Sequence, residues 1–155
     1  MAGQPHIPGW IEFDVTDLQV AELGMAPANI VKSSEEFEVS ASFAGSGVIW
    51  TWLELLSDLP GVDVVCNMVF SAEGIGPNAD ELDLGTAHTS LTAGGNPYTA
   101  MITVPANTLK KGVYTLAGYA TFEATSGGSS IPLPGVTGHH YGIGANKEEF
   151  SVYEH

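Results

Sequence analysis

A run of strict alternation between residues 113 and 122 constrains the fold more than any other feature of this sequence. A side-chain period of two over such a length is the pattern of a β-strand, and a helix would not produce it. The chain is therefore expected to build a sheet around this strand. One face of the strand would carry Tyr114, Leu116, Gly118, Ala120 and Phe122, and the other Val113, Thr115, Ala117, Tyr119 and Thr121.

Alternating segments elsewhere predict further strands. The sequence from Ile11 to Val15 alternates and is expected to continue to Val20 after a kink, and Ile30-Val31 is expected to add a short edge piece. Turns rich in glycine and proline separate the segments. The sequence therefore predicts an all-β chain. The remaining expected strands are 36–44, 48–53, 62–71, 84–91, 98–104 and 148–154.

The corner before the alternating run carries a resemblance to a known family. The pattern Leu109-x-x-Gly112-x-Tyr114 resembles the tyrosine corner of immunoglobulin-like and fibronectin-III-like β-sandwiches. The resemblance implies an immunoglobulin-like antiparallel β-sandwich of seven to nine strands, in which 124–147 is the long loop between strands F and G. It also implies that the Tyr114 hydroxyl bonds to backbone within 105–112, because a buried phenol needs a partner.

The chain is long enough to bury a core as one domain, 1–155, with an irregular N-terminal arm at 1–10. No apolar run reaches the length of a membrane span. The start lacks the basic and apolar regions of a signal peptide. Cys66 is the single cysteine, so an intrachain disulfide cannot form, and we interpret this thiol as a small buried hydrophobe. We expect a cytoplasmic protein, with a secreted form whose signal has been removed as the alternative.

The charge of the chain excludes whole classes of partner. It has 18 acidic residues against 4 lysines, contains no arginine, and carries a formal net charge of −14. Such a chain repels nucleic acid and anionic lipid, and it lacks the guanidinium fork that binds phosphate. We therefore expect no nucleic-acid, nucleotide or phospholipid partner.

Motifs of enzymes and tight metal sites are missing from the sequence. We therefore expect no enzymatic activity and no cofactor. His139 and His140 are adjacent, so their rings would point to opposite sides of an extended segment and would not share an ion. The acidic segment 73–83 offers oxygen ligands of the kind that suit calcium, but not at the spacing of an EF-hand. The weak metal candidates in it are Glu73, Asp80, Glu81 and Asp83.

Two consecutive segments, 48–56 and 62–70, are apolar on both faces, whereas an antiparallel sandwich needs only one apolar face. The arm, the 124–147 loop or another subunit could cover the second face. Residues 53–59 also fit helical spacing, which leaves a helix there as an alternative. The candidate interaction residues are Trp50, Trp52, Val65 and Val69 in these segments, and His139, His140 and Tyr141 in the loop.

The leading functional hypothesis is a non-enzymatic protein–protein interaction or assembly module, with a protein partner or a homo-oligomer. It would use the apolar region 48–70 or the 124–147 loop. The alternative is a ligand-binding module for calcium or carbohydrate, using the acidic 73–83 loop or the 124–147 loop.

Overall fold

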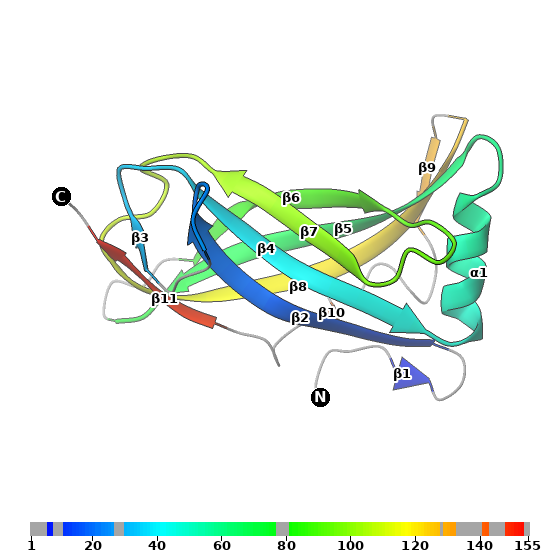
Figure 1. The fold of residues 1–155 in the computed structure, drawn as a ribbon, viewed down its shortest axis with the longest axis horizontal. Coiled ribbons are helices and arrows are strands. Elements are labelled where there is room, and N and C mark those ends of the chain that lie inside the picture. The colour runs from blue at the N-terminus through cyan, green and yellow to red at the C-terminus, as the bar shows by residue number, and fades with distance from the viewer. Residues whose placement is uncertain are drawn as a thin grey trace.

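A computed structural model of the chain describes residues 6–7, 11–26, 30–76, 81–127, 129–132, 141–142 and 148–153. They form two sheets that face each other, with one helix, α1 (Val48–Ser57), across one end (Figure 1). The strands are β1 (His6–Ile7), β2 (Ile11–Glu22), β3 (Ile30–Lys32), β4 (Phe37–Ser46), β5 (Val62–Gly74), β6 (Glu81–Ser90), β7 (Tyr98–Val104), β8 (Gly112–Ser126), β9 (Ser129–Pro132), β10 (Tyr141–Gly142) and β11 (Glu148–Tyr153).

The strand order is that of an immunoglobulin-like sandwich. One sheet has the order β1-β2-β4-β7 and the other β3-β11-β8-β5-β6, with β9 and β10 also paired to β8. Thus β2, β4 and β7 take the places of strands A, B and E, and β11, β8, β5 and β6 take those of G, F, C and C′. The predicted all-β sandwich of two sheets is confirmed, although the described residues form eleven strands where seven to nine were expected. Pairing is antiparallel except between β11 and β3, which run parallel.

The expected strand at 48–53 is wrong, because these residues begin α1. Gly47, with φ of 98°, follows the last residue of β4 and is the N-cap residue of the helix. The helix ends before Asp58. A helix was the alternative interpretation of 53–59, and the observed helix begins earlier, at Val48. Strand C is β5, and α1 occupies the connection between strands B and C.

Three other boundaries differ from expectation. The acidic segment is shorter than a 73–83 loop, because β5 runs to Gly74 and β6 begins at Glu81. The 124–147 segment contains strand pieces: β8 continues to Ser126 and pairs with β9, and β10 pairs further along the same strand. In the arm, His6–Ile7 pairs with β2. The expected kink in the first strand is present as a register shift between Thr16 and Gln19.

The core lies between the sheets and follows the predicted alternation. On β5, the side chains of Val64, Cys66, Met68 and Phe70 are fully buried. Burial raises the pKa of the Cys66 thiol, because the thiolate would lose its hydration. At the α1 end, an aromatic cluster fills the space between the sheets. It comprises Phe13, Phe43, Trp50, Tyr98 and Phe122, with neighbouring ring centroids 5.1–6.3 Å apart.

The corner before β8 has the predicted hydrogen bond. The hydroxyl of the buried Tyr114 donates to the Lys110 carbonyl at 2.8 Å, and Leu109 is buried beneath the corner. Gly112 has an extended φ of 159° and lies against the Tyr114 ring.

Replacing Tyr114 with phenylalanine should lower the free energy of unfolding by about 1–3 kcal/mol, because the Lys110 carbonyl loses its donor in a partly buried place. Urea denaturation of both proteins would measure the difference. A change below about 0.5 kcal/mol would mean that water replaces the hydroxyl without cost.

Candidate interaction surface on helix α1

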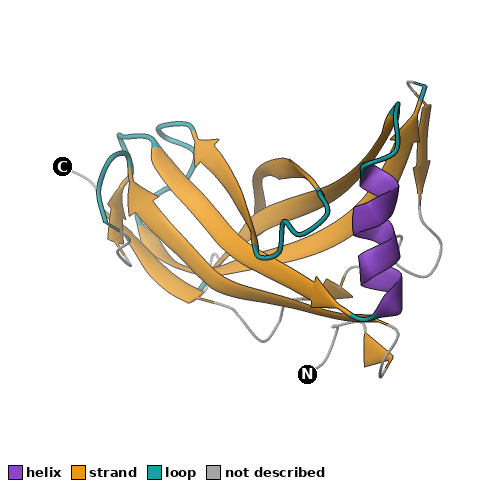
Figure 2. Cartoon of the chain, turned by 45° about the vertical axis from the view of Figure 1, so that its right-hand side comes forward, coloured by secondary structure: helices purple, strands orange, loops and turns teal. Residues whose placement is uncertain are grey.

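Helix α1 lies across one end of the sandwich and connects the end of β4 to the start of β5 (Figure 2). Its inner face closes the core, since Trp50 and Leu53 are 1% and 7% exposed. The sequence indicated Trp50 as a candidate contact residue, but Trp50 is buried in the core and cannot contact a partner. The helix therefore has a conventional apolar face toward the core.

The opposite face of α1 is also apolar. Val48, Trp52, Leu55 and Leu59 are 48%, 63%, 54% and 52% exposed. Val48, Trp52 and Leu55 follow one another at spacings of four and three residues, which place them along one side of α1, and Leu59 follows four residues later, just beyond the end of the helix. We call these four side chains the helix stripe. They are four of the ten exposed large hydrophobic residues in the described part of the chain.

Polar contacts fix the inner face of α1 to the segment before β7. The Tyr98 hydroxyl donates to the buried Glu54 carboxylate or to the Thr92 carbonyl, and it accepts the Thr92 N–H at 3.2 Å. The Ser57 hydroxyl donates to the Leu91 carbonyl. These bonds hold the helix in one orientation, so the helix stripe presents a defined surface.

Burial, and secondarily Glu54, raises the pKa of Tyr98 to about 12. The unfolded value is about 10, so the folded protein keeps a proton that the unfolded chain loses. Stability from this group is therefore complete below pH of about 10 and falls as the pH rises through about 12.

The native protein should show one tyrosine that ionises near pH 12, followed by phenolate absorbance, and Tyr98→Phe should remove this step. The variant should also lose part of the fall in stability over the same range. A native titration curve that is unchanged in Tyr98→Phe would contradict the assignment.

Val65 and Val69 lie on the outer face of β5 and are half-buried. Their cross-strand neighbours are Ser90 and Glu123 for Val65, and Thr86 and Tyr119 for Val69. Mostly polar neighbours thus separate the two valines among the described residues of this face. Their role as contact residues stays a prediction.

The candidate metal ligands do not converge. Glu73 and Glu81 face each other across β5 and β6, and Asp83 accepts the Gly85 N–H at 3.0 Å. No cluster of three metal-binding side chains exists in the described part of the chain, and Asp80 lies outside it. His139 and His140 also lie outside the described residues, and only the backbone of Tyr141 is described, in β10.

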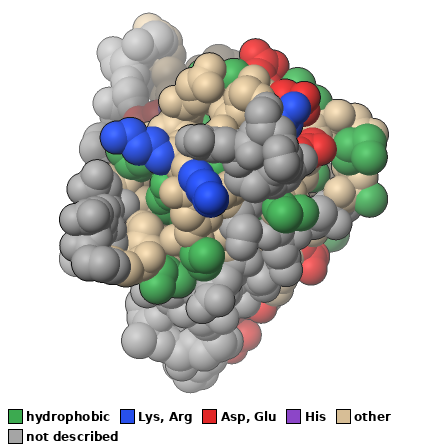
Figure 3. Space-filling model, turned by 90° about the vertical axis from the view of Figure 1, so that its left-hand side faces the viewer, with side chains coloured by type: hydrophobic (Ala, Val, Ile, Leu, Met, Phe, Trp, Pro, Cys, Tyr) green, Lys and Arg blue, Asp and Glu red, His purple; other side chains and the backbone are tan. Residues whose placement is uncertain are grey.

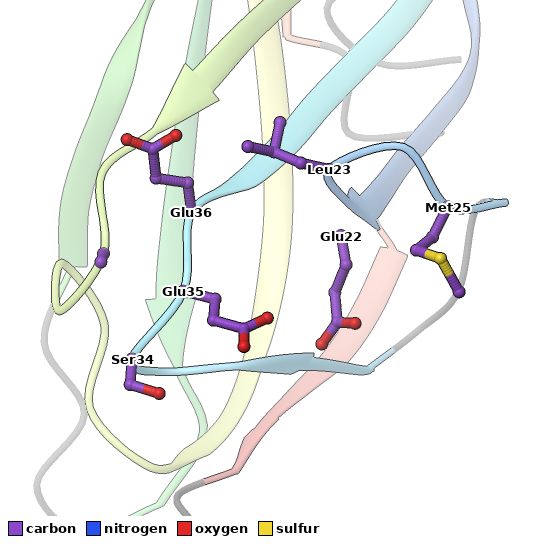
Figure 4. Close-up of a pocket in the computed structure, with 7 residues that line it drawn as sticks. Glu22, Leu23, Met25, Ser34, Glu35 and Glu36 are labelled. Carbon is purple, nitrogen blue, oxygen red and sulfur yellow. The ribbon is translucent and has the colours of Figure 1, made fainter.

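An open pocket of about 530 Å³ lies at the end of the sandwich away from α1 (Figure 4). The carboxylates of Glu22 and Glu35 lie near each other in it, and Lys32 forms an ion pair with Glu35 at 3.7 Å. Leu23 and Met25 add exposed apolar surface. Glu22 also accepts the Lys32 N–H at 3.2 Å, and the lining of the pocket does not indicate a particular ligand.

No protein-family model matches the sequence, and no curated protein matches it. Similar solved structures include the CARDB domain of a Pyrococcus furiosus protein in complex with di-metal ions, at 10% identity and TM-score 0.47, covering 97% of this chain and 100% of that domain. A β-glucosidase from Listeria innocua has 11% identity and TM-score 0.45, and the match covers 99% of this chain and 17% of the enzyme. The sporulation control protein Spo0M from Bacillus subtilis has 9% identity and TM-score 0.41, covering 92% and 50%.

These likenesses are too distant to carry a functional assignment, and this chain spans a small part of the glucosidase. No described helix is long and apolar enough to cross a membrane. The function must therefore be argued from the surface of this chain.

Sequence reasoning identified Trp52 but missed Val48, Leu55 and Leu59. Reading 48–53 as a strand placed Trp50 and Trp52 on one face, whereas a helix separates them. The signal that could have found the helix stripe is the spacing of four, three and four residues from Val48 to Leu59.

Proposed function

We propose that this protein is a non-enzymatic protein-binding module that contacts its partner through the helix stripe. The observation that carries the proposal is that α1 is apolar on both faces while only one face is covered in the described chain. A helix that is apolar all round is normally buried on all sides. Contiguous exposed apolar surface is a mark of protein interaction sites.

The composition of the helix stripe supports a protein partner. Trp52 is the most exposed of the four side chains, and tryptophan is enriched among residues that dominate binding energy. The only charged side chain exposed on the helix and its last turn is Asp58. Depletion of charge at the centre of a surface is typical of the core of a protein interface. The cytoplasmic location, inferred from the single cysteine, stays part of the proposal.

A photoreactive benzophenone amino acid at position 55 tests the proposal in the native cell. Illumination should link the protein to a defined protein partner, which mass spectrometry would identify as another chain or as a second copy. The same amino acid at position 67, on the outer face of β5, is the matched control and should give little or no product. No protein product from position 55 would contradict the proposal.

A further inference from the structure

The edge strands of the two sheets differ in how they are protected against pairing with another chain. An edge strand presents unpaired N–H and C=O groups, and natural proteins shorten, bend or charge such strands. Within the described residues, β1, β3, β9 and β10 have only two to four residues each, and β11 is paired on both sides over part of its length. In the two longest edge strands the pairing contains a register shift and two acidic side chains are exposed, Asp14 and Asp17 in β2 and Glu81 and Asp83 in β6.

Strand β7 has none of these protections. It pairs with β4 without a break over all seven residues, and it contains no charged residue and no proline. No other strand of the described chain pairs with its second side. Strand β6 belongs to the other sheet and approaches β7 through side chains, with Ile102 packed against Gly85. Met101, at the centre of β7, is 55% exposed, so this strand is an open and uncharged edge.

We propose that β7 pairs with β7 of a second copy of this chain, antiparallel and about a two-fold axis at Met101. The β1-β2-β4-β7 sheets of the two copies then form one continuous sheet. This contact is separate from the helix stripe and goes beyond the function proposed above. A two-fold contact uses the same surface on both copies, so it closes after two copies and produces a dimer.

The order of residues along β7 identifies the second copy as the partner. With Met101 opposite Met101 of the second copy, all seven residues pair, Thr99 faces Thr103, and Ala100 faces Ile102. Threonine pairs and apolar pairs are among the cross-strand pairs that stabilise sheets. On the core side, the bulky Ile102, already packed against β6 of its own copy, meets the small Ala100 of the other. A register centred at Ile102 would instead pair only five residues and set the two Ile102 side chains against each other.

The register keeps acidic side chains of the outer sheet face apart. Glu38 of β4 is the acidic neighbour of β7 on this face, beside Thr103. In the continuous sheet the two Glu38 residues are three strand spacings apart, about 14 Å. This separation exceeds the Debye length of about 8 Å at physiological salt. The contact therefore sets no carboxylate of this face directly opposite another.

The acidic residues of β6 lie toward one end of the contact. The segment after β6 bonds to the start of β7, and Gly85 packs against Ile102, so the two strands run in opposite directions. Glu81 and Asp83, at the start of β6, therefore lie toward the end of β7, where charged side chains of both signs gather (Figure 3). The two-fold axis directs these ends of the two copies away from each other. The repulsion that remains is that of two bodies of net charge −14.

Sedimentation velocity of the purified protein over a range of concentrations tests the proposal. The wild type should form a dimer and no longer species, and added salt should strengthen the dimer by screening the repulsion between acidic copies. Met101→Glu sets two carboxylates about 5 Å apart at the axis and should weaken dimerisation at least about tenfold. Ser40→Glu is the matched control, because Ser40 lies beside Met101 on β4 and should dimerise as the wild type does. Far-UV circular dichroism would confirm that all variants are folded.

Mixing Met101→Glu with Met101→Lys tests the position of the axis. Each variant alone should dimerise weakly, and an equimolar mixture should recover a one-to-one dimer, because opposite charges then meet. No recovery in the mixture, undiminished dimers of Met101→Glu, or a wild type that is monomeric at about 1 mM would overturn the proposal. A dimer that is lost in Trp52→Ser/Leu55→Ser but kept in Met101→Glu would also overturn it and would make a second copy the partner of the helix stripe. Cross-linking at position 55 does not depend on β7, so the two proposals fail separately.

Discussion

Replacing Trp50 with alanine should lower the free energy of unfolding by about 3–5 kcal/mol, whereas the same replacement at Trp52 should change it by less than about 0.5 kcal/mol. Trp50 is 1% exposed and contacts Phe13, Phe122 and Tyr98. Its removal would leave a large cavity between the sheets. Trp52 is 63% exposed, so alanine there removes little buried surface.

The two substitutions are matched in chemistry and lie two residues apart, so urea denaturation of both variants compares position alone. The comparison also distinguishes a helix from a strand at 48–53. In a strand the two side chains would share a face and lose similar stability. Similar losses at both positions would therefore contradict the helix. A neutral Trp52→Ala variant would in addition be suited to binding measurements.

Gly45→Ala is the second change with a large expected effect, about 3 kcal/mol or more of lost stability. A Cβ atom at Gly45 would overlap the ring of Trp50, which is packed against other aromatic rings and cannot move aside. The backbone of Gly45 is also fixed, because its N–H donates to the Asn96 side chain at 3.1 Å and its carbonyl accepts from the same side chain. Thermal or urea denaturation would measure the loss.

Gly118→Ala provides the matched control. Gly118 is also buried in a central position of a strand, but its Cβ would meet Phe70 and Leu18 at 3.5–3.6 Å, which is ordinary contact. Alanine should change stability there by less than about 1 kcal/mol. Equal losses at positions 45 and 118 would show that glycine matters for backbone freedom in general and not for the approach of Trp50.

Alternation along the chain predicted the strands whose two faces differ. The inward side of 113–122 follows directly from the residues, because burial of one sheet face determines which side chains are apolar. The corner at Leu109 and Tyr114 was expected from the resemblance to the tyrosine corner of immunoglobulin-like sandwiches. The segment 48–53 failed for a non-local reason. Its valine, isoleucine and tryptophans favour a strand locally, but the packing of Trp50 on Gly45 selects a helix.

The candidate interaction surface was predictable only in part for the same reason. Trp52 could be identified because it lies in a segment that is apolar on both faces, but the other residues of the helix stripe are found only with the helical period.

The three short segments along one side of β8 make this edge a suitable place for inserting foreign sequence. Glu123 pairs with Pro132 and Ala120 pairs with Tyr141, so residues 133–140 connect positions on β8 that are only three residues apart. A longer connection would not shift the pairing on either side, and each doubling of its length costs only about 0.6 kcal/mol in closure entropy. An epitope tag or a fluorescent reporter placed there would be inserted far along the chain from α1, so the residues of the helix stripe would stay unchanged.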